Sequence, residues 1–229
     1  MWRVVAWLGQ AREGRARQGN FLKQEDSMVA KKVVDKKKVV ISAINTKSFS
    51  FTIRNMQGSS LICHRFSEKS IGEIEAKQQK TAKQAKAARD PDAEFHASLY
   101  SLNDSGGFGF PASGLKKACV RAASYADGMP MTKARGAFHV IGDLLEIKGA
   151  EPEMRRDIVR LKNGNADMRY RGEFDKWKMV ATVVYNENII SKEELMNLVN
   201  LAGFHVGLGD WRPECNGSHG MFEIEGANA

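Results

Sequence analysis

Apolar and polar residues alternate in several short stretches of the chain, and a period of two is typical of β-strands that bury one face. The alternation is clearest over residues 176–185. It recurs over residues 49–54, which follow an apolar run at residues 39–44. Residues 137–147 predict either a hairpin or one bent strand, and a short strand is expected around residues 221–224. The pattern predicts a sheet whose strands are spread over most of the chain.

Two stretches instead carry apolar residues at helical spacing. The first, residues 113–126, follows a Gly-Phe-Gly-Phe segment at residues 107–110. That segment matches only the centre of the RNP1 motif of RNA-recognition domains, and we expect a turn with packing aromatics. The second helix begins with a capping box at residues 191–194 and is expected to stop at Gly203. When residues 67–100 are left aside, the order is βαββαβ. This predicts an α+β fold, the ferredoxin-like or RRM-like antiparallel sheet backed by two helices.

Two segments lie outside this predicted core. Residues 67–101 form a helical excursion after the first strands, and its basic residues recur every third position. Such charges wrap around a helix, so a solvated helix is favoured over a nucleic-acid arm. Residues 1–27 differ in composition from the rest and predict a disordered or mis-assigned extension before a start at Met28, with an organelle transit peptide as the alternative. Residues 28–229 are then expected to form a single α+β domain.

Composition and charge narrow the function classes. The chain has 229 residues, of which 42% are hydrophobic and 27% charged, as in a globular protein. No stretch approaches the roughly 20 apolar residues of a membrane span, which excludes transmembrane transport. The three cysteines are odd in number and far apart, which argues against a secreted disulfide framework and favours a reducing cytoplasm. The formal net charge of +8 favours polyanionic partners, although part of the excess lies in residues 1–27 and in the helical excursion.

The most distinctive stretch is Gly-Leu-Gly-Asp-Trp-Arg-Pro-Glu at residues 207–214. Gly207 and Gly209 permit a tight backbone whose N–H groups can bind an anion. Trp211 offers a stacking face, and Arg212 offers a bidentate phosphate donor. The alternative is a structural loop in which Trp211 fills a gap and Arg212 pairs with a carboxylate. The stretch is neither a Walker loop nor a dinucleotide fingerprint.

A second candidate segment interleaves basic and aromatic side chains at Arg169, Tyr170, Arg171 and Trp177. In an extended segment Arg169 and Arg171 share one face and Tyr170 lies on the other, so a groove that uses both needs neighbouring strands. Because residues 151–178 hold eight basic and six acidic side chains, a salt-bridged surface is the alternative. We predict phosphate contacts for the arginines here and in the glycine-rich stretch, and base stacking for Tyr170 and Trp211.

No pattern in the sequence indicates a metal, a cofactor or a catalytic residue. The Cys/His pairs Cys63–His64 and Cys215–His219 would have to meet from opposite ends of the chain to bind zinc, so inert thiols are favoured. No nucleophile elbow, HExxH, kinase or P-loop motif occurs. A metal-dependent hydrolase would have to draw on four polar residues near the glycine-rich stretch: His205, Asp210, Glu214 and His219.

Four motifs together resemble a family of uncharacterised phage and prophage proteins. They are residues 60–69, Pro111-Ala112 ahead of a Lys-Lys-Ala helix, residues 168–171 and the C-terminal G-x-G-D-W-R-P-E. The resemblance covers about Val39 to Ile224 and implies no established activity. Cys215 and His219 depart from the basic and aromatic positions of that pattern. An RRM-like core with a glycine-rich loop before its last strand is also distantly similar, at the level of fold, to RAMP-type RNA-binding subunits of CRISPR complexes.

These observations predict a non-enzymatic protein of phage or prophage origin that binds single-stranded DNA or RNA in the cytoplasm of a bacterial host cell. No cofactor and no membrane partner are expected. A phage protein that acts on a host factor or an assembly through protein contacts is the alternative, and a metal-dependent hydrolase is the third. The oligomeric state stays open.

Overall fold

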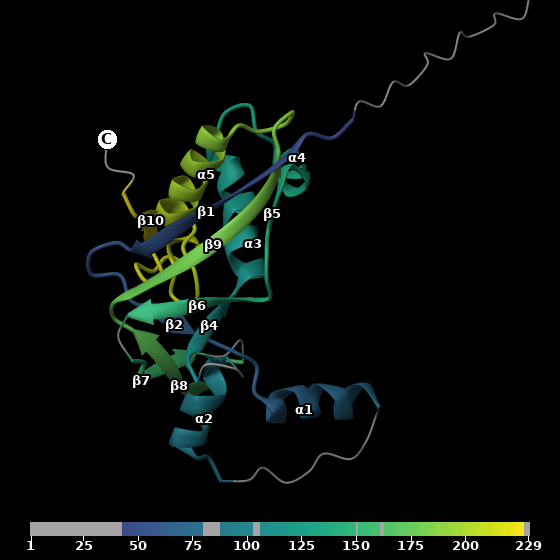
Figure 1. Ribbon diagram of the computed structural model, residues 1–229. Helices are drawn as coiled ribbons and strands as arrows, with labels where there is room; N and C mark the ends of the chain where they lie inside the picture. Colours follow the sequence, from purple (N-terminus) through teal and green to yellow (C-terminus); the bar gives the residue numbers. More distant parts are fainter. Residues whose placement is uncertain (1–42, 80–87, 103–105, 150, 161–162, 227–229) are drawn as a thin grey trace, which may run out of the picture. The chain divides into compact units, whose positions relative to one another are not determined.

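Two antiparallel sheets and five α-helices make up the described part of the computed structural model (Figure 1). The structure describes residues 43–79, 88–102, 106–149, 151–160 and 163–226. All of them belong to one compact unit, Ser42–Ala229. The predicted N-terminal extension and most of the apolar run at residues 39–44 lie outside the described residues, so those predictions stay predictions.

The larger sheet has the spatial order β10–β1–β9–β6–β4–β3, and β5 also pairs with β9. All its pairings are antiparallel. β5 pairs with residues 183–185 of β9 and β6 pairs with residues 177–179, so these two segments follow one another along the same neighbour. The bent strand is therefore the correct alternative for residues 137–147. The strands are β1 (Thr46–Asn55), β3 (Tyr100–Ser101), β4 (Phe108–Pro111), β5 (Phe138–Val140), β6 (Leu144–Gly149), β9 (Trp177–Asn186) and β10 (Phe222–Ile224).

The predicted fold class is confirmed by this strand order. The first strand, β1, lies between the last strand, β10, and the third, β9, while the bent strand β5/β6 lies on the other side of β9. Helix α3 (Ala112–Ala122) falls between the first and second of these strands along the chain, and helix α5 (Lys192–His205) falls between the third and fourth. This is the βαββαβ arrangement of the ferredoxin-like fold.

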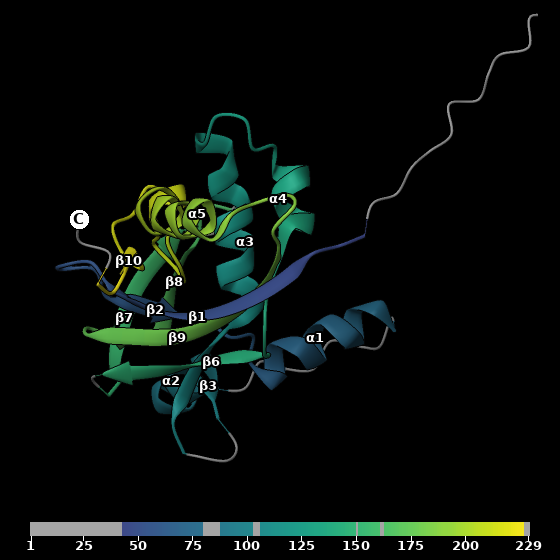
Figure 2. The same ribbon diagram turned by 45° about the horizontal axis from the view of Figure 1, so that its top comes forward.

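The two helices cover one face of the sheet. Figure 2 shows α3 and α5 on the same side of β1, β9 and β6, and the two helices pack against each other. Residues of β9 alternate between buried and exposed, with the buried ones facing the helices. The outward positions of β1, β9 and β6 carry Ser, Thr, Val, Leu, Asn and charged side chains and no aromatic ring. The open face therefore differs from an RRM-type stacking platform.

The helix ends follow local rules with one exception. Ser191 and Glu194 form the predicted capping box of α5, and Asp90 accepts hydrogen bonds from the first turn of α2 (Pro91–Ser98). Gly203, however, does not end α5, which continues to His205. A Cβ atom at Gly203 would overlap the carbonyl oxygen of Phe222, so this glycine allows the helix to approach β10 closely. The predicted helix stop was wrong because packing, and not termination, requires the glycine.

A smaller three-stranded sheet has the order β2–β8–β7. It consists of β2 (Leu61–Cys63), β7 (Glu153–Arg160) and β8 (Ala166–Phe174), and α2 packs against β8. The alternation rule missed the β7–β8 hairpin because charged residues occupy both of its faces. On one face the charges are paired with each other, as described below.

Two further segments correct or extend the predictions. Residues 107–110 are not a turn, since β4 pairs with both β3 and β6. Within the predicted excursion, α1 (Glu68–Gln78) is a helix with Ile71 and Ile74 exposed, in line with a solvated helix. Residues 80–87 of that excursion lie outside the described part of the chain. Helix α3 continues into the 3-10 turn η1 (Ala123–Tyr125), and α4 (Met131–Ala137) precedes β5.

Candidate nucleic-acid interface

The glycine-rich loop between α5 and β10 is fastened to β2 by backbone hydrogen bonds. Asp210 N donates to Ile62 O over 3.0 Å, and Gly220 N donates to Ser60 O over 2.7 Å. Gly207 and Gly209 adopt φ values of +72° and +71°, which glycine reaches without strain. A Cβ atom at Gly209 would overlap the carbonyl oxygen of Ile62. The two predicted site glycines thus have a structural role in shaping the loop.

A pocket of about 380 Å³ lies between this loop and α3. His64, Tyr100 and Phe110 contribute rings to its lining. Lys117 and Arg121, one helical turn apart, line it from α3, and Arg212 lines it from the loop. Two carboxylates, Asp210 and Glu214, also reach the pocket. Three cations and three ring-bearing residues around one pocket fit an anionic ligand that carries a flat group.

The cations of the pocket differ in how they are paired. Arg121 Nε lies 2.9 Å from Glu214 Oε1, and Arg212 Nη2 lies 3.0 Å from Glu214 Oε2. Lys117 is exposed and has no ion pair within the described part of the chain. The predicted pairing of Arg212 with a carboxylate is therefore present. It leaves the guanidinium partly exposed at the pocket and not buried beneath it.

Trp211 does not fill a gap in the core. Its side chain is 41% exposed, and its backbone adopts a φ of +54° between Asp210 and Arg212. That region is uncommon for a residue with a side chain. The backbone is held there by a hydrogen bond from His219 N to Trp211 O over 3.1 Å. The loop thus presents a large aromatic ring to solvent, directly before the pocket residue Arg212 in the chain.

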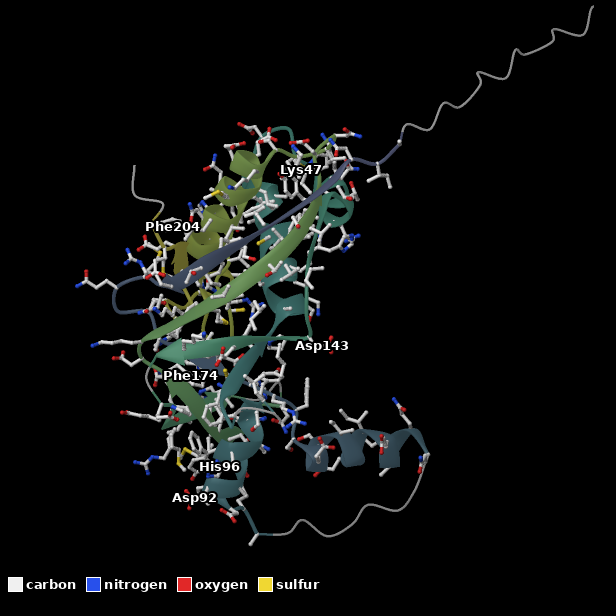
Figure 3. The ribbon with its side chains drawn as sticks, in the orientation of Figure 1. Lys47, Asp92, His96, Asp143, Phe174 and Phe204 are labelled. Carbon is white, nitrogen blue, oxygen red and sulfur yellow. The ribbon has the colours of Figure 1, made fainter. Side chains whose placement is uncertain are left out.

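Exposed aromatic side chains also gather where α3 and α5 end. The Tyr125 ring stacks on His205 with centroids 4.4 Å apart and planes within 10°. Phe204, labelled in Figure 3, is exposed and contacts the same histidine edge-on at 5.0 Å. Lys117 and Arg121 are four residues apart on the exposed side of α3, and Tyr125 follows in the 3-10 turn η1. Sequence reasoning missed these residues, although that spacing was the signal that would have found them.

Arg171 is the centre of a buried ion network between the β7–β8 hairpin and the loop. The residue is 8% exposed. Its Nη2 lies 3.0 Å from Asp210 Oδ2, and its Nη1 lies 3.7 Å from Asp157 Oδ2. Arg155 extends the network to Asp157 and Glu173. The guanidinium group of Arg171 already forms ion pairs with two carboxylates, so its predicted phosphate contact is corrected to a structural role.

The carboxyl group of Asp210 has a lowered pKa in this network, so it stays ionised at a lower pH than an ordinary aspartate. Burial by itself raises the pKa of its carboxyl group. The hydrogen bond from His64, whose Nδ1 lies 3.2 Å away, and the charge of Arg171 outweigh burial, so the net pKa is lowered. Asp210 is thus a fixed negative charge at one side of the pocket.

The remaining predicted residues of the Arg169–Trp177 segment are separated. Trp177 is 2% exposed, and its indole nitrogen donates to Ser59 O over 3.2 Å. It is a core residue, which corrects its prediction as a binding residue, because the inward positions of β9 are all buried. Arg169 and Tyr170 lie on opposite faces of β8, as predicted, and Arg169 Nε lies 2.9 Å from Asp167 Oδ2. Tyr170 is opposite Arg156 of β7, so one basic–aromatic pair remains on the hairpin.

The thiols differ in access. Burial raises the pKa of Cys63 and of Cys119 to about 12, whereas Cys215 is exposed.

No group of three or more His, Cys, Asp and Glu side chains suited to a metal ion occurs among the described residues. Within the same residues, no helix has the length and apolar character needed to cross a bilayer.

We expect a thiol reagent to modify one cysteine of the native protein, Cys215, and all three after unfolding in guanidinium, because a buried thiol with a raised pKa supplies no thiolate. Mass spectrometry after iodoacetamide treatment measures this. Cys215→Ser is the control and should remain unmodified when native. Rapid labelling of Cys63 or Cys119 in the native protein would contradict the burial described above.

Comparison with known proteins adds a distant likeness in fold. No protein-family model and no curated protein matches the chain. A chain of the Type III-B Cmr-beta complex bound to cognate target RNA matches with a TM-score of 0.49 and 10% identity, covering 79% of this chain and 59% of that one. Cmr6 from Pyrococcus furiosus matches with a TM-score of 0.41 and 10% identity, covering 80% of this chain and 100% of that one. At these scores, the fold assignment rests on the strand order alone.

Proposed function

We propose that this protein binds single-stranded nucleic acid and performs no chemistry on it. The observation that carries the proposal is the pocket lined by three cations and three ring-bearing residues, with the exposed Trp211 directly before Arg212 in the same loop. Proteins that bind single strands without a base code combine a basic groove with aromatic stacking faces. In this assignment Lys117, Arg121 and Arg212 contact phosphates, while Trp211 and the stacked Tyr125 ring contact bases.

The proposed surface lies away from the outward face of the larger sheet. RRM domains stack bases on aromatic side chains of that face. The outward positions of β1, β9 and β6 offer none, so stacking has to come from the loop and the helix ends. Tyr170 and Arg156 on the β7–β8 hairpin are a second basic–aromatic pair for a strand long enough to reach it.

We expect fluorescence polarisation with labelled single-stranded DNA and RNA to detect binding that weakens steeply between 50 and 200 mM salt, because phosphate contacts release counterions. Lys117→Gln should reduce the slope of log K against log salt by about 1. Trp211→Ala should weaken binding about 5- to 150-fold and leave the slope unchanged, since stacking contributes about 1–3 kcal/mol per base.

The matched control is Lys148→Gln, which removes a cation that pairs with Glu146 on the open sheet face. It should change affinity less than twofold. If neither DNA nor RNA bound with salt sensitivity at low ionic strength, the proposal would be refuted. A pull-down partner that resists nuclease treatment would then favour the alternative of a protein-directed function. The phage or prophage origin and the bacterial host cytoplasm stay predictions.

A further inference from the structure

Glu214 occupies the space between two arginines that come from different elements. Arg121 on α3 approaches one carboxylate oxygen over 2.9 Å. Arg212 on the loop approaches the other with Nη2 over 3.0 Å and Nε over 3.2 Å. Guanidinium groups bind phosphate with the same planar fork geometry. The carboxylate thus stands where a phosphate would be held by the same donors.

The carboxylate is not needed to hold its own turn in place. Glu214 belongs to the 3-10 turn η2 (Pro213–Cys215), which is closed by hydrogen bonds from Cys215 N to Arg212 O and from Asn216 N to Pro213 O. Glu214 N donates to Val206 O over 3.3 Å. These contacts involve only the backbone. The side chain can therefore leave the arginines while the turn keeps its fold.

The ion pairs that hold the carboxylate are also partly open to solvent. The side chains of Arg121 and Arg212 are 49% and 33% exposed. Ion pairs with this access to water are weakly held, so a stronger anion can replace the carboxylate. Lys117 lines the same pocket and adds a third positive charge for the incoming group.

We infer that a backbone phosphate of the nucleic acid displaces the Glu214 carboxylate and binds between Arg121 and Arg212. Glu214 then acts as a built-in competitor that weakens binding to any polyanion unable to replace it. This inference rests on the proposed function and specifies the group that is bound and the contact that limits its affinity.

The test is the variant Glu214→Gln, which keeps the size of the side chain and removes its charge. Oligonucleotide binding should become about three- to tenfold tighter, because the competing carboxylate is removed. The slope of log K against log salt should stay nearly the same, because the same phosphate is bound in both proteins. In an Arg121→Gln background, the same change should give a smaller gain. The melting temperature of each variant is measured to confirm folding.

The matched control is Glu223→Gln, which removes the same charge from a pair with Arg54, 2.8 Å away and outside the pocket. It should change affinity less than twofold. Salt-sensitive binding by the natural chain with equal effects of the two Gln variants would overturn the inference and leave the proposed function intact. Absence of binding by every variant would overturn both.

A parallel titration separates the possible sources of the phosphate. Inorganic phosphate and AMP, tested against Glu214→Gln, should compete with the oligonucleotide only at millimolar concentration. Binding of AMP as tight as that of the oligonucleotide would show that the pocket takes a free nucleotide, and this would overturn the assignment to a backbone phosphate.

Discussion

Replacing Arg171 by methionine is expected to lower the free energy of unfolding by about 3–5 kcal/mol, because the change leaves buried carboxylates without their cation. Arg171 lies within ion-pair distance of both Asp157 and Asp210, and the side chains of Arg171 and Asp157 are nearly inaccessible to water. Methionine fills much of the volume but carries no charge. A guanidinium titration followed by tryptophan fluorescence measures the loss.

Arg169 provides the control within the same strand. It lies two residues earlier on the same face of β8, its side chain is about one-third exposed, and it pairs with Asp167. Arg169→Met should therefore cost less than about 1 kcal/mol. Similar losses for the two variants would contradict the buried network.

The pH dependence of stability gives a second test of the Arg171→Met variant. The folded-state pKa of Asp210 is lowered, so its contribution to stability is present above the unfolded pKa of about 3.9 and is lost as the pH falls through the lower folded value. Arg171→Met removes one of the charges that lower this pKa. The stability of that variant should therefore fall less steeply below pH 4 than the stability of the natural chain.

Replacing Gly203 by alanine is expected to destabilise the fold by about 3 kcal/mol or more, at the upper end of overpacking costs. The added Cβ atom would overlap the backbone carbonyl oxygen of Phe222, which no side-chain rotation can relieve. Either α5 or β10 has to move, and both belong to the core arrangement of the ferredoxin-like fold. Thermal unfolding followed by circular dichroism measures the effect.

Gly136 is the matched control for this glycine. It lies in α4, and an added Cβ atom would meet no other atom within 4 Å. Gly136→Ala should raise stability by up to about 1 kcal/mol, since alanine favours the helix. If Gly203→Ala were as stable as Gly136→Ala, the close approach of α5 to β10 would be refuted.

Features set by a few neighbouring residues could be predicted from the sequence. The capping box at Ser191 and the alternation along β9 depend on local geometry alone, and both were predicted correctly. The βαββαβ order followed from adding such elements. The predicted end of the helix at Gly203 was wrong because this glycine is required by its close approach to the backbone of Phe222, a residue distant in the sequence.

The candidate site was harder to predict for the same reason. Arg169 and Arg171 look equivalent in the sequence. In the fold, Arg171 is buried and pairs with Asp210 of the glycine-rich loop, whereas Arg169 stays partly exposed and pairs with Asp167. Trp177 and Trp211 look equally available, yet one lies at an inward position of a central strand and the other on a loop. Only the assembled fold shows which basic and aromatic side chains remain accessible.

Strand β2 connects the two regions that carry the candidate contacts. It pairs with β8 of the hairpin, and the carbonyl groups of Ile62 and of the preceding Ser60 accept hydrogen bonds from the glycine-rich loop. The loop and the base of the hairpin are therefore fixed relative to each other before any ligand arrives. The entropy of ordering the surface is lost during folding, so a bound strand has to supply only its own ordering. Pre-organisation of this kind favours affinity without enlarging the area of contact.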